Sequence, residues 1–276
     1  MPTRVETVIT SENSVGIFWR ELWEYRDLFY FLAWRDFKVR YKQTVIGVAW
    51  AVIRPLITML VFTFLFNRIA KLPTEGGAPY TILVFSAMLP WYFFSSTLQE
   101  SSLSLINSAN MISKVYFPRV IIPVSTVFVN AVDFFISLTI LFLLMALLKF
   151  TPTVKLAWMP LFFIQATLVS IGIGLWLSAL NVSYRDFRYV VPFILQLGLY
   201  VSPVGFSSNL VPEEWRLAYA LNPMVGVIDG FRWGLLDDSV TIHWPSFRIS
   251  LAVGLLLFGS GLWYFQKVEQ RFADVI

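Results

Sequence analysis

The sequence has no cysteine and a single histidine, and only 14% of its 276 residues are charged. It therefore forms no disulfide, and the lone His243 supplies neither a zinc site nor a catalytic triad. Soluble domains carry about 25% charged residues, so the low charge argues against a soluble class. The dipeptide Gly-Lys is absent, and with it the phosphate-holding G-x-x-x-x-G-K-[ST] loop of ATPases. We expect no metal, no bound cofactor and no ATP site in this chain.

Long apolar stretches take the place of charge, and 57% of the residues are hydrophobic. A helix needs roughly 20 apolar residues to cross a bilayer. The pattern predicts an all-α polytopic membrane protein with a single transmembrane domain over 1–276. An interface helix would occupy 1–46, the spans 47–266 and a short tail 267–276. The predicted spans are about 47–67, 79–99, 120–148, 157–180, 189–208 and 249–266.

The distribution of positive charge predicts the orientation of these spans. With the N-terminus in the cytoplasm, the cytoplasmic segments hold 13 of the 21 Lys and Arg residues and the outer segments hold seven. Cytoplasmic loops of membrane proteins carry this kind of excess. Both termini are therefore expected in the cytoplasm.

The segment before the first span has the pattern of an amphipathic helix. Apolar residues from Phe18 to Leu32 recur at helical spacing, and Arg35, Lys38 and Lys42 form a basic row. Such a helix lies in the membrane interface with its cations near lipid phosphates. It either anchors the chain or also contacts a partner.

Residues 203–248 are too many for a simple loop between spans. Pro212 and Asn222-Pro223 are helix-start signals, so we expect short helices over about 212–221 and 223–236. Each is too short to cross a bilayer, and together they fit a re-entrant hairpin in the outer leaflet.

Two charged residues, Arg54 and Asp133, fall inside predicted spans. Charges at such depth rarely face lipid. Each either points into the bundle and is satisfied by neighbours such as Asn130, or lines a polar pathway. Their different depths leave a direct pair between them open. Ser170, Gly174 and Ser178 recur every four residues in the fourth span, which favours close helix packing within one chain or between two copies.

The stretch "MISKVYFPR" carries a basic, aromatic cluster between the second and third spans. Residues 107–115 could form about two helical turns before Pro118 stops them. Aromatic and arginine side chains are favoured at protein interfaces, and they also suit lipid headgroups. The residues alone leave a docking element and an interfacial anchor equally open.

Several motifs in order give the chain a family resemblance. They are "RDFKVRYKQTVIGVAWAVIRPL", "MISKVYFPRVIIP", "NVSYRDFRYVVPFILQ", "SPVGFSS", "ALNPMVGVIDGFRWGLL" and "EQRFADVI". Together they resemble the membrane subunits of ABC-2-type polysaccharide exporters, in the O-antigen branch, which is related to teichoic acid exporters. Arg54 departs from the uncharged residue expected before Pro55.

The resemblance implies two sets of functional residues. The coupling set, which would dock on a separate ATPase subunit, is Asn110, Met111, Lys114, Tyr116, Phe117, Pro118, Arg119, Arg185 and Asp186. The set for the substrate channel and periplasmic gate is Trp91, Tyr92, Phe93, Tyr200, Phe206, Trp215, Asn222, Pro223 and Arg232. Aromatic rings suit a sugar cargo because the C–H face of a sugar stacks on them, although each ring could equally serve the lipid belt or the core.

The resemblance also implies a function and a set of partners. The chain would be the permease of an ABC exporter that moves lipid-linked polysaccharide across the bacterial inner membrane, through a channel at a homodimer interface. Two ATP-binding subunits, which hold ATP and Mg²⁺, would complete a heterotetramer. The alternatives are a permease for teichoic acid, capsular polysaccharide or a small drug or lipid. A membrane-embedded glycosyl-lipid transferase would need a carboxylate or basic cluster at the membrane surface, and the sequence shows none.

Overall fold

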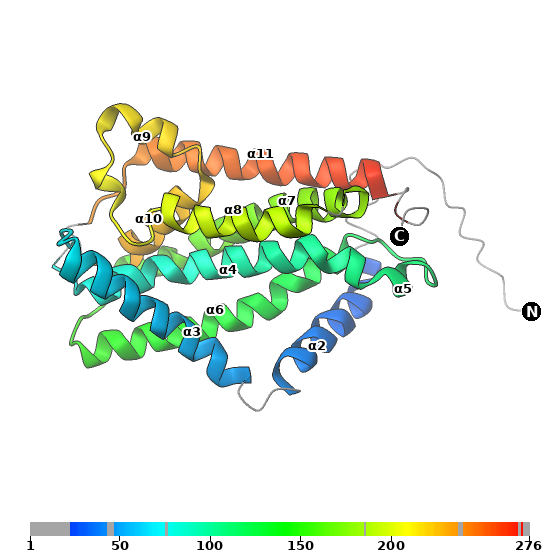
Figure 1. The fold of residues 1–276 in the computed structure, drawn as a ribbon, viewed down its shortest axis with the longest axis horizontal. Coiled ribbons are helices and arrows are strands. Elements are labelled where there is room, and N and C mark those ends of the chain that lie inside the picture. Colours follow the sequence, from blue (N-terminus) through cyan, green and yellow to red (C-terminus); the bar gives the residue numbers. More distant parts are fainter. Residues whose placement is uncertain are drawn as a thin grey trace, which may run out of the picture.

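The computed structural model describes residues 23–42, 47–74, 77–184, 186–236, 240–269 and 272. Within these ranges the regular secondary structure is helical, as the composition predicts. Figure 1 shows long helices running side by side, with α5 and the C-terminal end of α11 at one end of the bundle and α9 and α10 at the other.

The chain enters the bundle through α2 (Arg26–Lys42), which packs against α6 and α3. Helix α3 (Gly47–Phe62) passes through Pro55 without ending and continues as the π-helix η1 (Thr63–Ile69). Arg54 and Pro55, which interrupt the apolar run of the predicted first span, therefore do not end the helix. Residues 1–22, which include the first part of the predicted interface helix, lie outside the described residues.

The central helices are α4 (Tyr80–Asn107) and α6 (Ile121–Leu147), joined through the one-turn helix α5 (Ala109–Ile112). A 3₁₀ turn, η2 (Val154–Trp158), leads into α7 (Met159–Ser183). Helix α8 (Phe187–Val201) and the turn η3 (Ser208–Leu210) precede the short helices α9 (Glu213–Tyr219) and α10 (Pro223–Leu235). The last helix is α11 (Trp244–Glu269).

Five helical segments among the described residues are long and apolar enough to cross a membrane. They are Val52–Ile69, Tyr80–Asn107, Ile121–Leu147, Val154–Ser183 and Trp244–Glu269. The predicted fifth span, 189–208, is instead the 15-residue helix α8 followed by non-helical chain. At 1.5 Å per residue α8 is about 22 Å long, which is shorter than the roughly 30 Å hydrocarbon core. Six full spans therefore remain a prediction.

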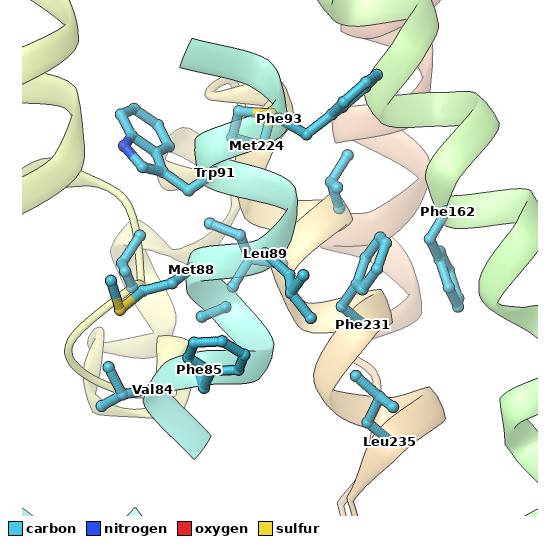
Figure 2. Close-up of a cluster of buried hydrophobic side chains, with 14 of the residues drawn as sticks. Val84, Phe85, Met88, Leu89, Trp91, Phe93, Phe162, Met224, Phe231 and Leu235 are labelled. Atoms are coloured by element: carbon cyan, nitrogen blue, oxygen red, sulfur yellow. The ribbon is translucent and has the colours of Figure 1, made fainter. Parts of the chain in front are cut away.

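Helix α4 forms the centre of the fold. The most apolar stretch of α4 is 78% buried inside the chain, against 17% for that of the first span. Its side chains meet those of α7 and α10, and Figure 2 shows α4, which carries Leu89, beside α10, which carries Phe231. The first span is consequently peripheral, and most of its surface faces outward from this chain.

Small residues let α7 pack closely against α4 and α11. A Cβ on Gly174 would lie 2.6 Å from Ser101 Oγ of α4, and Ser170 and Ser178 are fully buried in the same chain. The four-residue repeat is therefore an intramolecular packing seam, which decides between the two alternatives left open by the sequence. On α11, a Cβ on Gly261 would clash with the carbonyl of Gly172, so α7 and α11 meet backbone to backbone.

Candidate functional site: the coupling segment and the outer hairpin

Residues 108–120, between α4 and α6, are named the coupling segment after the role predicted for them. They form a short protrusion at one end of the bundle (Figure 1). Helix α5 covers four residues, so the expected helix over 107–115 is reduced to one turn followed by hydrogen-bonded turns. Helix α4 itself takes up Asn107. The segment is thus a short reversal that connects the end of α4 to the start of α6.

The tip and the base of this segment differ in exposure. Lys114 and Tyr116 are exposed, and 65% of Tyr116 is accessible. Asn110 is also exposed and Met111 is half-buried, whereas Phe117 is 3% exposed. The result is a tip with one basic and one aromatic side chain on an apolar base, and the aromatic Tyr116 is a residue type that protein interfaces favour.

The base is braced by the C-terminal end of α11. The backbone N–H of Arg119 donates to Glu269 Oε1 at 2.6 Å, and the Arg119 guanidinium donates to the Glu269 carbonyl. Phe117 shares a buried cluster with Phe265 and Phe272. Pro118 is buried beside it. Arg119 therefore supports the base of the segment, and of the residues predicted for coupling in this segment Asn110, Lys114 and Tyr116 are exposed.

The second part of the predicted coupling set lies at the start of α8. Asp186 is exposed there, as are Tyr184 and Tyr189, and the Arg188 guanidinium lies 4.8 Å from the centre of the Tyr189 ring. Arg185 lies outside the described residues. An exposed polar and aromatic surface therefore follows α7, as the sequence predicts.

At the other end, the chain after α8 leaves the helical path and four of its carbonyls are capped by side chains. Arg232 Nη1 donates to the Phe206 carbonyl at 2.7 Å and Nη2 to the Val204 carbonyl at 3.1 Å. Tyr80 donates to the Gly205 carbonyl. Tyr219 donates to the Val201 carbonyl at 2.8 Å. Backbone carbonyls without helical partners are costly in an apolar setting, so these side chains allow the helix to break here.

Burial raises the pKa of the Tyr219 phenol well above its ordinary value, and the charge of Asp229 acts in the same direction. The hydroxyl group therefore stays protonated and remains a donor to α8 over the whole physiological range.

Asn222 and Pro223 start α10 as the sequence predicts. The Asn222 Oδ1 atom accepts from the Met224 N–H at 3.0 Å, while Nδ2 donates to Ser202 Oγ at 2.9 Å. One side chain thus caps α10 and ties it to the break after α8. Helix α10 is nearly all buried, so within this chain it has no face open to cargo. Arg232, at 1% exposure, is a core residue.

The aromatic candidates separate into core and surface groups. Trp91 and Phe93 are buried, with Phe93 in contact with Phe134 and Phe163. Figure 2 shows both side chains on α4. Their expected place in a channel lining is not supported by this packing.

Other rings are accessible. Tyr200 is 60% exposed and stacks on Phe62, and Trp215 of α9 is 65% exposed. Phe206 and Tyr92 are half-buried. These four remain candidates for contact with cargo or with a second chain.

The two charged residues in the predicted spans, Arg54 and Asp133, contact different partners. The Arg54 side chain is exposed, and its guanidinium lies 5.6 Å from the centre of the Tyr92 ring. Asp133 instead accepts hydrogen bonds from Arg40, at 2.6 Å from Nη1, and from Tyr41. Sequence reasoning missed Arg40 and Tyr41 because it placed α2 flat in the interface, although "RYK" before the first span was a visible signal.

The sequence of this chain matches a known protein family. Residues 27–236 match the ABC-2 type transporter family. The chain belongs to that family. The matched range includes the coupling segment and the outer hairpin, which is formed by α9 and α10.

Relatives within the ABC-2 family extend the similarity over most of the chain. An O-antigen export system permease protein RfbA of Klebsiella pneumoniae is 28% identical over 251 residues, covering 91% of this chain and 95% of the relative. A protein of the same name from Myxococcus xanthus is 26% identical over 259 residues, with coverages of 93% and 98%. The polysialic acid transport protein KpsM of Escherichia coli is 20% identical over 235 residues, or 81% and 89% of the two chains.

Proposed function

We propose that this ABC-2 protein is the membrane subunit of an ATP-driven exporter of O-antigen-type polysaccharide. The observation that carries the proposal is the correspondence with RfbA proteins of two species over more than nine-tenths of both chains. A match of this extent covers the coupling end, the spans and the outer hairpin together. The coarser function, a membrane component of an ABC-2 transporter, follows from family membership alone.

ATP and Mg²⁺ would bind to a separate subunit, because the sequence lacks the loop that cradles phosphates. The exposed Lys114 and Tyr116 form the docking tip, and the brace between Arg119 and Glu269 supports it from behind. A rigid support matters because force on the tip must move α4 and α6 rather than bend the loop. Two copies of this chain and two ATPase subunits would make the complete exporter.

The polysaccharide path would run between two copies of this chain. Helices α3, η1 and α8 present exposed apolar and aromatic side chains on the outside of the bundle, among them Ile57, Phe64, Phe193 and Tyr200. The interior of a single chain is filled by the side chains around α4, as Figure 2 shows. A large cargo therefore has room only at an interface, where such rings can stack on sugar faces.

The outer hairpin would control the exit from this path. Helix α10 is held inside the bundle, so α9 with its exposed Trp215 is the part that could move. The α9 and α10 end faces the periplasm if the coupling end is cytoplasmic, as the positive charges indicate. The chain would then lie in the bacterial inner membrane with both termini in the cytoplasm.

The test removes the gene for this chain from its source bacterium and restores it from a plasmid. We expect O-antigen to disappear from the cell surface, lipid-linked polymer to accumulate inside the cell, and both effects to be reversed by the plasmid. Unchanged O-antigen at the surface of the deletion strain would refute the proposal.

Export of a capsular polysaccharide is the second candidate, and the similarity to KpsM favours it. The same deletion strain separates the two functions. Loss of the capsule with normal O-antigen would identify the capsular function, because the two polymers are extracted and resolved separately.

A further inference from the structure

A charged cluster joins three helices that are far apart in the sequence. Arg40 of α2 donates to Glu100 of α4, to Asn130 Oδ1 of α6 at 3.1 Å and to Asp133 Oδ2 of α6 at 2.6 Å. Asn130 Nδ2 donates to Glu100 Oε2 at 3.0 Å. Tyr41, next to Arg40, donates to the other oxygen of Asp133. One guanidinium therefore holds carboxylates from two spans.

Glu100 and Asp133 lie well inside their helices, so their carboxylates need a positively charged partner such as Arg40. Glu100 lies about 10 Å before the end of α4 and Asp133 about 18 Å after the start of α6, at 1.5 Å per residue. Carboxylates at such depth are costly unless they are paired. The planar guanidinium serves both because it has several donors in a fixed fork, whereas a lysine ammonium is a point charge on a flexible stem.

The cluster also has a specific place relative to the coupling segment. Glu100 belongs to the helix that enters residues 108–120, and Asp133 belongs to the helix that leaves them. Arg40 thus joins both arms of the coupling segment to α2. The other ionic pair of α2 near this site, Arg35 with Asp36 at 2.8 Å, stays within α2 and is more exposed.

We infer that Arg40 is a positioning residue that fastens α2 to α4 and α6, so that the three helices move as one body when the coupling segment is displaced. The inference rests on the proposed function for the meaning of that displacement. Arg40 acts through the helices that it joins and needs no contact with ATP or cargo.

The first test asks whether Arg40 fastens α2, and it needs no cargo. The chain has no cysteine, so Ala33→Cys introduces a single thiol at a position that is 2% exposed on α2. In the complex with the ATPase subunit, we expect Arg40→Gln to raise the labelling rate of this thiol by about tenfold or more, because the change leaves the part-buried carboxylates of Glu100 and Asp133 without their cation. Arg35→Gln, with the same change in charge on the same helix, should change it by less than about twofold, since an exposed pair contributes little.

The second test measures polysaccharide exported per ATP hydrolysed. We expect Arg40→Gln to lower this ratio while the ATPase subunit still co-purifies, because the tip of the coupling segment is unchanged. In an Arg40→Cys/Asp133→Cys variant the ratio should be low and should recover when a short bifunctional thiol reagent joins the two cysteines. Recovery by a covalent link shows that fastening, rather than charge, is the function.

Three results would overturn the inference. The first is an unchanged labelling rate in Arg40→Gln, and the second is an unchanged ratio of polysaccharide exported to ATP hydrolysed. The third is a cross-linked variant that stays inactive, which would mean that α2 must separate from α6 during export. If Arg40→Gln fails to accumulate, Arg40→Gln combined with Glu100→Gln and Asp133→Asn removes the unpaired charges, and the same measurements decide. A wild-type complex that exports no polysaccharide refutes the proposed function, whereas the labelling result stands independently of it.

Discussion

Replacing the buried Arg232 with methionine should destabilise the outer end of the bundle. The guanidinium makes two short bonds, to the carbonyls of Phe206 and Val204, and a longer one of 3.5 Å to the carbonyl of Leu83. Methionine fills much of the same space but donates nothing. The carbonyls after α8 would then have to remain unpaired, or the chain there would have to rearrange.

The expected magnitude follows from the two short bonds. Hydrogen bonds to a charged group contribute about 1.5–3 kcal/mol each, so their loss should cost roughly 3–6 kcal/mol. For a chain of this size, about 3 kcal/mol corresponds to a drop on the order of 10 °C in the midpoint of thermal unfolding. The loss should be at the upper end if water cannot reach the freed carbonyls.

The assay is the fraction of detergent-solubilised protein that stays monodisperse after heating to a series of temperatures. Arg216→Met is the matched control, because Arg216 also donates to two carbonyls, of Val211 at 3.1 Å and Asn209 at 3.2 Å, but its side chain is 25% exposed and within reach of water. Water replaces those bonds, so the control should lose only about 1 kcal/mol. Equal midpoints for Arg232→Met and Arg216→Met would refute the assignment of Arg232 as the support of the break.

Three further predictions concern other parts of the molecule. Lys114→Glu should reduce co-purification of the ATPase subunit at least severalfold, whereas Lys149→Glu, the same charge change at the opposite end, should not; equal binding would remove the docking role. Gly261→Ala should lower the thermal midpoint because its methyl group would clash with a carbonyl of α7, while Gly259→Ala, which meets nothing within 4 Å, should leave it unchanged or raise it slightly; a stable Gly261→Ala would contradict the close packing. Asn222→Ala should cost about 1–2 kcal/mol by removing the cap of α10, with most of the loss recovered in Asn222→Asp; an unaffected midpoint would show that the cap is dispensable.

Sequence patterns predicted the long helices well because a bilayer restricts a spanning chain to about 20 apolar residues in a helix. The bounds of α6 and α7 and the start of α4 follow from hydropathy, whereas α4 ends at Asn107, beyond the predicted end near 99. The starts of α9 and α10 follow from the capping signals at Pro212 and Asn222. The basic and aromatic residues Lys114 and Tyr116, and their place between two spans, also followed from local sequence. These features depend on residues that are neighbours along the chain.

The tertiary structure decided the features that depend on distant residues. Hydropathy could not show that α10 is buried, because an amphipathic pattern does not identify what covers each face. Nor could it show that Arg119 braces the base through Glu269, 150 positions away, or that Asp133 is paired with Arg40. Sequence alone determined that the long helices form and, within a few residues, where they begin, since hydropathy and capping act over a few residues. Only the packed structure decided which charges meet and which aromatic rings remain exposed, because ion pairs and burial depend on side chains that the fold brings together from separate helices.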